Sequence, residues 1–288
     1  MNSSVWLIPA VFGAVCTGGL IRSQYERNHF VIEETVITSG KIRAPKTLVF
    51  LSDMHDKEFG PNNTRLLEAI AGIHPDMVLI GGDTMVAKKG NGDLKATENL
   101  IRGLTAISPV YYGNGNHEQR LHAERDVYGD SYLEFCRLLN RYGVTYLSDA
   151  SVDVGEDLTI SGLNIDKVFY KDFVPAKMKA EYIQAHLGTA DKGRFQILLA
   201  HSPMFLEAYG SWGADLTLSG HFHGGTIRLP FVGGVMTPQF QFFLPWCSGV
   251  FEEDGHHMIV SRGLGTHSIN ISFNNKPQVV VVRLKLGD

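Results

Sequence analysis

Short apolar runs that end at glycine, aspartate or histidine recur along this chain, and they constrain its fold more than any other feature. Three of them, at residues 47–52, 77–80 and 110–112, lead directly into Asp53, Gly-Gly-Asp83 and Gly-Asn-Gly-Asn-His117. Runs this short and this apolar are typical of strands that are buried on both faces. The sequence therefore predicts a sheet whose strands each deliver polar residues at the carboxyl end.

Helical periodicity separates these runs at residues 61–73 and 93–107, so strand and helix alternate as in α/β proteins. Ligands of open α/β sheets bind at the carboxyl ends of the strands. Further helices are predicted at residues 127–142 and 176–187. Further strands are predicted at residues 30–38, 144–147, 151–154, 158–163, 196–200, 216–218, 258–261, 269–273 and 279–286. We expect a polar connector at residues 23–46 and one domain at residues 47–288.

Composition fits a large α/β domain, because the chain has 288 residues, of which 44% are hydrophobic. Its 26 basic and 30 acidic residues give a formal net charge of −4. That balance lacks the basic excess of a nucleic-acid-binding surface, so it gives no signature of such a partner. The cysteines Cys16, Cys136 and Cys247 are far apart and predict no disulfide framework.

The amino-terminal segment carries no charge between residues 5 and 21, a length at the lower limit for a bilayer span. It lacks the basic start and the small-residue cleavage site of a signal peptide. We therefore predict that residues 1–22 form a single membrane anchor, with a signal peptide or a buried core helix as the alternatives. The basic residues Arg22, Arg27 and Lys41 follow the run, so the positive-inside rule places the domain on the cytoplasmic side.

Side chains of metal-ligating type follow the predicted strands in a fixed order. Taken singly, an aspartate after a strand is often a helix cap, and a buried histidine is often an ordinary core residue. Carboxylate, imidazole and amide oxygen together suit a pair of divalent metals, with Mn, Fe, Zn and Mg all tolerated. Two such ions, about 3.5–4 Å apart, activate water and clamp a phosphoryl group. The sequence thus predicts a two-metal phosphoesterase whose metal ligands are Asp53, His55, Asp83, Asn116, His201, His221 and His223.

The order of these motifs over roughly residues 47–286 resembles that of the calcineurin-like metallophosphoesterase superfamily. The matching segments are Asp53-Met-His55, Gly82-Asp83, Gly115-Asn-His-Glu118, His201 and Gly220-His-Phe-His223. The segments at residues 220–225 and 260–265 are similar to a bacterial branch of YkuE/YaeI type. This resemblance implies a four-layer αββα sandwich, here preceded by an amino-terminal apolar helix.

The resemblance also implies a role for each residue. Asp53, His55, Asp83 and His223 would hold one metal; Asp83, Asn116, His201 and His221 would hold the other, with Asp83 bridging. A metal-bridging hydroxide would attack phosphorus in line, and His117 would serve the leaving group as an acid or a cation. Glu118 would position its loop. Some members orient the histidine with an aspartate just after Gly-Asp, but here Thr84, Met85 and Val86 follow, so the sequence identifies no such partner.

The sequence does not distinguish phosphomonoesters, phosphodiesters and pyrophosphates as the substrate class. The apolar residues 229–232 and 240–246 predict either core packing or an apolar wall for a lipid-linked substrate. Arg228 and Arg262 are candidates for binding a second phosphate, and His267 is a candidate for phosphate contact or for a surface position. The alternative functions are a catalytically silent scaffold on the same fold and a mononuclear metallohydrolase of another ester.

Overall fold

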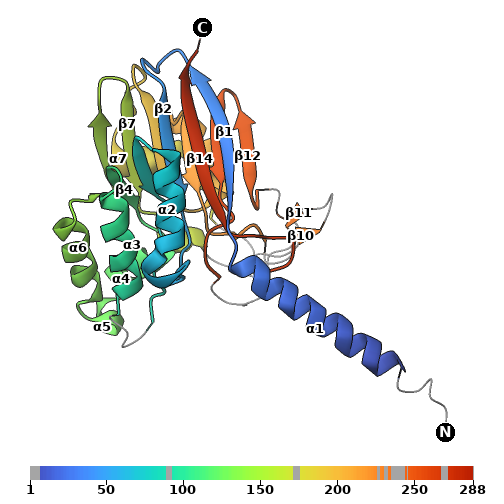
Figure 1. The fold of residues 1–288 in the computed structure, drawn as a ribbon. Helices are drawn as coiled ribbons and strands as arrows, with labels where there is room; N and C mark the ends of the chain where they lie inside the picture. Colours follow the sequence, from blue (N-terminus) through green and yellow to red (C-terminus); the bar gives the residue numbers. More distant parts are fainter. Residues whose placement is uncertain are drawn as a thin grey trace.

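Two six-stranded mixed sheets form the body of the protein (Figure 1). The computed structural model describes residues 7–88, 93–170, 176–225, 228–229, 233–234, 244, 246–266 and 272–287. In the first sheet, β2, β3, β4 and β5 are parallel, β14 is antiparallel to β2, and β1 is parallel to β14. Its order is β1 (Val31–Ser39), β14 (Gln278–Leu286), β2 (Lys46–Leu51), β3 (Met77–Ile80), β4 (Val110–Gly113) and β5 (Thr145–Leu147).

The second sheet has a parallel centre and antiparallel outer strands. Its order is β12 (Gly249–Glu253), β13 (His256–Val260), β9 (Leu216–Ser219), β8 (Phe195–Ala200), β7 (Leu158–Leu163) and β6 (Ala150–Val154). A separate pair joins β10 (Arg228–Leu229) to β11 (Gly233–Gly234).

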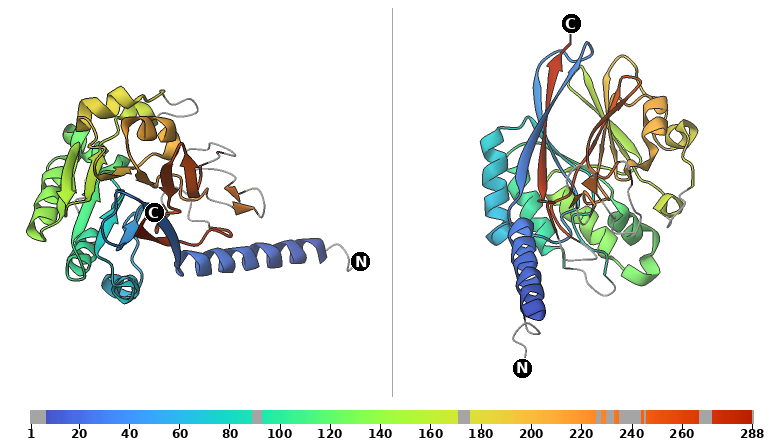
Figure 2. Two further views of the ribbon diagram at one scale, coloured as in Figure 1. Left: turned by 90° about the horizontal axis from the view of Figure 1, so that it is seen from above. Right: turned by 90° about the vertical axis from the view of Figure 1, so that its right-hand side faces the viewer.

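Among the described residues, alternation of side chains along the strands builds three hydrophobic cores. In β2, Leu48 and Phe50 pack between the two sheets, whereas Val49 and Leu51 pack against helices on the outer face. Burying one such side chain stabilises the fold by about 1.5–3 kcal/mol. A third core lies between the second sheet and its own helices. The layers therefore follow in the order helices, sheet, sheet, helices, as Figure 2 shows in its right-hand view.

Most predicted helices are present, with different limits. The helix predicted at residues 127–142 is divided because Gly129 has φ 58°, outside the helical region. The short helices α4 and α8 were not predicted, and residues 269–271 of a predicted strand lie outside the described residues. The helices that cover the sheets are α2 (Thr64–Ile73), α3 (Lys95–Thr105), α4 (Asn116–Ala123), α5 (Arg125–Tyr128), α6 (Ser131–Arg141), α7 (Ala180–Leu187) and α8 (Leu206–Trp212).

The first helix, α1 (Leu7–Arg27), projects away from the two sheets (Figures 1 and 2). The predicted membrane anchor at residues 1–22 is wrong, because from residue 7 onward the described chain contains no helix with the length and apolarity that a bilayer span requires. Gly13, Thr17 and Gly18 dilute the apolar run, and Arg22 lies in the same helix. The predictions of membrane localisation, with the domain on the cytoplasmic side, and of a membrane partner are corrected accordingly.

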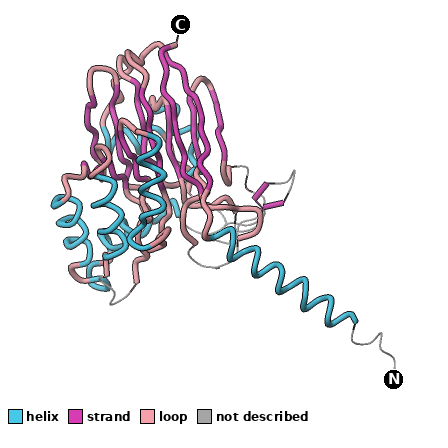
Figure 3. The backbone as a smooth tube through the Cα atoms, in the orientation of Figure 1, coloured by secondary structure: helices cyan, strands magenta, loops and turns pink. Residues whose placement is uncertain are grey.

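The carboxyl ends of the parallel strands position the site. β2 runs antiparallel to β14, so it ends on the side of the molecule opposite the carboxyl terminus of the chain. Figure 3 shows loops gathered at that end of both sheets. The segments that follow β2, β3, β4, β8 and β9 carry the predicted ligands.

Candidate metal centre

Loops from both sheets bring the predicted histidine and aspartate ligands together. Within each of three buried groups, one ligand atom per residue lies within 4.8 Å of the others. The groups are Asp53, His55 and His223; His55, Asp83 and His117; and Asp83, His201 and His221. Two of these groups each contain three of the four residues of a metal set predicted from the sequence, and the full sets stay predictions. The third group includes His117, which the resemblance does not count as a ligand.

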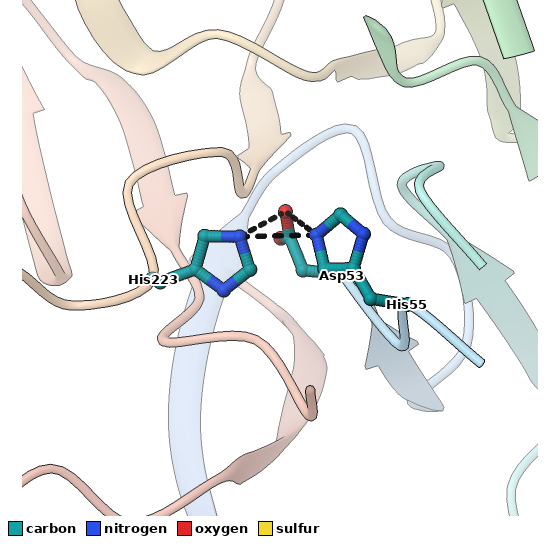
Figure 4. A group of neighbouring side chains, drawn as sticks. All are labelled: Asp53, His55 and His223. Atoms are coloured by element: carbon teal, nitrogen blue, oxygen red, sulfur yellow. Dashed lines mark hydrogen bonds and ion pairs between the residues drawn. The ribbon is translucent and has the colours of Figure 1, made fainter. Parts of the chain in front are cut away.

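The first group is shown in Figure 4, where Asp53, His55 and His223 converge on a common point. The Nε2 atoms of His55 and His223 are 3.1 Å apart, and Asp53 Oδ1 is 3.4 Å from Nε2 of His223. Nδ1 of His223 donates to the carbonyl oxygen of Gly265 at 3.1 Å, which leaves its Nε2 lone pair directed at the group. This carbonyl partner fixes the ring as partners of metal-bound histidines do.

The second group is arranged around Asp83. Asp83 Oδ2 is 3.2 Å from Nε2 of His201, and Nδ1 of His201 donates to the Gly81 carbonyl oxygen at 2.7 Å. Asn116 Oδ1 is buried and has no hydrogen-bond partner among the described residues. Asn116 directly precedes His117, whose backbone N–H donates to Asp83, and an orphaned amide oxygen is a ligand type that divalent cations accept. Asp83 Oδ2 also lies 3.8 Å from Nε2 of His55, so Asp83 stands between the two groups.

Burial and mutual charge set the pKa values of the histidines. Burial acts to lower the pKa of His201, but the negative charges of Asp83 and Asp53 outweigh it and raise this pKa to about 10. Burial lowers the pKa of His221 to about 3, helped by the positive charge of His201, and burial lowers the pKa of His223 to about 4. Two imidazoles are therefore neutral at pH 7, as ligands must be. A bound cation would take the place of the proton on His201 in balancing the aspartates.

The ligand loops adopt backbone conformations that non-glycine residues seldom use. Five ligand residues have positive φ, namely Asp53 (55°), His55 (47°), Asp83 (54°), His221 (69°) and His223 (50°). Conformations of this kind persist where the surroundings enforce them and are concentrated at functional sites. Gly82 has φ 87°, and a Cβ atom added to it would lie 1.9 Å from the backbone nitrogen of Gly115. This close approach explains why a glycine stands directly before Asp83.

Glu118 connects two of the ligand loops, the one at Asp83 and the one at Gly115. Its buried carboxylate accepts backbone N–H bonds from Asp83 at 2.9 Å, Thr84 at 3.1 Å and Gly115 at 2.9 Å. The hydroxyl of Tyr112 donates to the same carboxylate at 2.6 Å. Burial, with the charge of Asp83, raises the pKa of Glu118. This geometry agrees with a positioning role, because the carboxylate binds the backbone of both the loop at Asp83 and the loop at Gly115.

We expect Glu118→Ala to lower the free energy of unfolding by at least about 3 kcal/mol, because three backbone N–H groups would lose their acceptor and each costs about 1–3 kcal/mol. Denaturant unfolding of the chelated protein measures this change. Glu134→Ala, at an exposed position of α6, is the control and should stay within about 0.5 kcal/mol of the parent. A loss below about 1 kcal/mol for Glu118→Ala would show that water replaces the carboxylate.

His117 has an orienting partner that the sequence did not reveal. Its Nδ1 accepts the backbone N–H of Ala87 at 2.9 Å, and its own backbone N–H donates to Asp83 Oδ1 at 2.8 Å. The side chain is buried, with 2% exposed. Because Nδ1 accepts, the neutral ring carries its proton on Nε2, the nitrogen that can then donate. A main-chain donor leaves no mark in residue type, so sequence reasoning could not find it.

Tyr170 is a second residue that sequence reasoning missed. It ends the short 3₁₀ segment Lys167–Tyr170. Its ring centroid lies 4.9 Å from that of His221, edge to face, and 6.4 Å from that of His201. Tyr170 therefore forms one wall beside the second group. The sequence offered no signal for it, because a tyrosine outside any motif does not indicate a site.

The predicted phosphate-binding arginines have partners within the protein. Arg228 Nη1 donates to the Gly224 carbonyl oxygen at 3.0 Å, and the guanidinium of Arg262 pairs with Glu33 at 2.6 Å. Binding of a second phosphate by either arginine stays a prediction. Most of residues 229–232 and 240–246, and His267, lie outside the described residues, so the apolar-wall hypothesis and the role of His267 also stay predictions.

Comparison with known proteins finds one matching family and several related bacterial proteins. Residues 46–225 match the family described as calcineurin-like phosphoesterase. The protein YpbG of Bacillus subtilis (strain 168) is 25% identical over 263 residues, which cover 89% of this chain and 88% of that protein. The metallophosphoesterase YkuE of the same organism is 37% identical over 91 residues, 32% of this chain and 31% of that protein. The phosphodiesterase YaeI of Escherichia coli (strain K12) is 25% identical over 245 residues, 84% of this chain and 83% of that protein.

Proposed function

Because the chain belongs to the calcineurin-like phosphoesterase family, we propose that it is a phosphoesterase that works with two divalent metal ions. The observation that carries this proposal is the position of Asp83, whose carboxylate lies between two groups of buried ligands. A shared carboxylate is the feature that joins two cations into one centre. Family membership supports phosphoester hydrolysis, and the two groups support two ions.

In this proposal the ligands divide as the sequence predicted. Asp53, His55, Asp83 and His223 would hold the first ion, and Asp83, Asn116, His201 and His221 would hold the second. When bound, the ions would polarise the phosphoryl oxygens and lower the pKa of a water molecule, so that hydroxide is available at neutral pH for in-line attack on phosphorus. Manganese, iron, zinc and magnesium all suit this donor set to some degree.

His117 would serve the leaving group. With Nδ1 engaged by Ala87, its Nε2–H can donate a hydrogen bond, and then a proton, to the departing oxygen. Asp83 accepts the backbone N–H of His117, so the residue shared by the two ligand groups also fixes this histidine. Positioning of this kind lowers the barrier, because the donor needs no reorientation during the reaction.

For the substrate, we infer a phosphodiester as the first class to test, because a relative that aligns with most of this chain is named a phosphodiesterase. Tyr170 places an aromatic ring beside His221, where it would contact an organic group of such a substrate. Phosphomonoesters, pyrophosphates and lipid phosphoesters belong in the same screen as competing classes.

Chelation followed by reconstitution tests the proposed function. The chelated chain is expected to lose activity on bis(p-nitrophenyl) phosphate by at least about a thousandfold, because each ion supplies several kcal/mol of transition-state stabilisation. Addition of Mn²⁺, Fe²⁺, Zn²⁺ or Mg²⁺ should restore it, with two ions per chain by elemental analysis. p-Nitrophenyl phosphate, a nucleotide-sugar pyrophosphate and a lipid phosphoester complete the substrate panel.

Three results would speak against this function. Activity that survives chelation would remove the metals from the reaction. Full activity at one ion per chain would favour the mononuclear alternative. Two bound ions without activity on any substrate of the panel would favour the silent scaffold.

A further inference from the structure

The carboxyl-terminal turn of α1 is packed into the domain, although much of the helix projects from it (Figure 1). The exposed fractions of Ser23 and Glu26 are 3% and 0%, whereas Phe12 is 70% exposed. Ser23 Oγ accepts the backbone N–H of Ser272 at 2.9 Å, and Glu26 Oε2 accepts that of Asn275 at 3.2 Å. The end of α1 therefore holds the segment that leads into β14.

Asn275 joins this segment to the metal centre. Its Nδ2 donates to the carbonyl oxygen of His223 at 2.6 Å and to that of Gly225 at 3.4 Å. Between them, Gly224 has φ 68°, and a Cβ atom added there would lie 2.4 Å from Asn275 Oδ1. The side chain of Asn275 thus occupies the inside of the turn that carries His223.

Glu26 is a buried carboxylate at a position that the proposed reaction does not use. One oxygen accepts from Arg22 Nε at 2.7 Å, and the other accepts from Asn275. A buried charge is costly unless it is paired and hydrogen-bonded, and removing its partner leaves a large penalty. The arrangement therefore favours a single orientation of Asn275 relative to α1.

We propose that Glu26 is a positioning residue for the metal ligand His223, acting through Asn275. The inference rests on the proposed function, because His223 matters in this way only as a ligand. His223 has φ 50°, a conformation that the surroundings must enforce, and Asn275 supplies hydrogen bonds on both sides of the following glycine. Partners behind metal ligands typically change metal affinity by about 10- to 100-fold when they are removed.

Mn²⁺ titration of the chelated full chain by calorimetry tests this link. Glu26→Ala and Asn275→Ala are each expected to weaken one of two Mn²⁺ sites by about 10- to 100-fold and to leave the other within about twofold. Glu26→Gln keeps an oxygen for Asn275 and should stay close to the parent. Gln24→Ala, at an exposed position in the same helical turn, is the matched control and should not change either site.

The double variant decides whether Glu26 acts through Asn275. If it does, the variant that combines Glu26→Ala with Asn275→Ala should bind Mn²⁺ at least as tightly as the single variant that binds it less tightly. If the fold losses in Mn²⁺ affinity of the two single variants multiply in the double variant, the inference is overturned. It is also overturned if the single variants bind Mn²⁺ at both sites with the parental affinity. Should Glu26→Ala fail to fold, by circular dichroism, Asn275→Ala alone decides: unchanged affinity overturns the link, and loss at one site supports it. A parent chain that binds no Mn²⁺ would instead reject the metal centre, and this inference with it.

Discussion

His117→Ala is expected to lower kcat by about 10²- to 10⁴-fold while two metal ions stay bound. The histidine is buried, its Nδ1 is occupied by Ala87, and its backbone is fixed by Asp83. Only the side chain is removed by the substitution, so the hydrogen bond from the backbone N–H to Asp83 is kept. The loss should therefore appear in turnover and not in assembly of the site.

Leaving-group dependence makes this test specific. A general acid matters most for a poor leaving group, so the loss should be larger for an alkyl phosphodiester than for bis(p-nitrophenyl) phosphate. Steady-state kinetics of the Mn²⁺-loaded chain measure both. His122→Ala, an exposed histidine of the same helix, is the control and should keep kcat within about twofold of the parent. Loss of a bound ion in His117→Ala would instead place His117 among the ligands, as its grouping with His55 and Asp83 permits.

The strands and the residues that follow them were predictable because their pattern is local. Buried strands such as β3 are continuous apolar runs, and Gly-Gly-Asp83 follows at once. The order of such segments then indicated which residues would meet at one edge. Local patterns could not predict the backbone conformation of the ligand loops, because the positive φ of Asp53 and of Asp83 depends on neighbours from other loops.

Contacts that depend on distant segments were also hidden. Ala87 offers a backbone N–H to His117, and nothing about an alanine marks that role. Glu26 and Asn275 are 249 residues apart in sequence, and their hydrogen bond exists only because β1 lies beside β14. The error at the amino terminus has a different cause. The segment at residues 5–21 lacks charge, but glycines such as Gly18 and Gly19 contribute so little to burial in lipid that it falls short of a bilayer span.

Asp83→Asn should have the second large effect, and it should differ in kind from that of His117→Ala. Asp83 Oδ2 lies within 3.8 Å of His55 Nε2 and within 3.2 Å of His201 Nε2. The amide keeps nearly the same shape but removes the negative charge that both ligand groups share. Affinity for both ions should therefore fall together, unlike the loss at one site expected for Asn275→Ala.

Activity should fall with the ions in Asp83→Asn. If either ion is lost, several kcal/mol of transition-state stabilisation go with it, so kcat/KM at a fixed Mn²⁺ concentration should drop by at least about a thousandfold. Calorimetric titration and steady-state kinetics on the same preparation separate binding from turnover. Asp76→Asn, just before β3 at its opposite end and exposed to solvent, is the matched control and should change neither quantity by more than about twofold. Two Mn²⁺ ions bound with parental affinity in Asp83→Asn would mean that the centre does not depend on a shared carboxylate, and the assignment of Asp83 as the ligand common to both ions would have to be withdrawn.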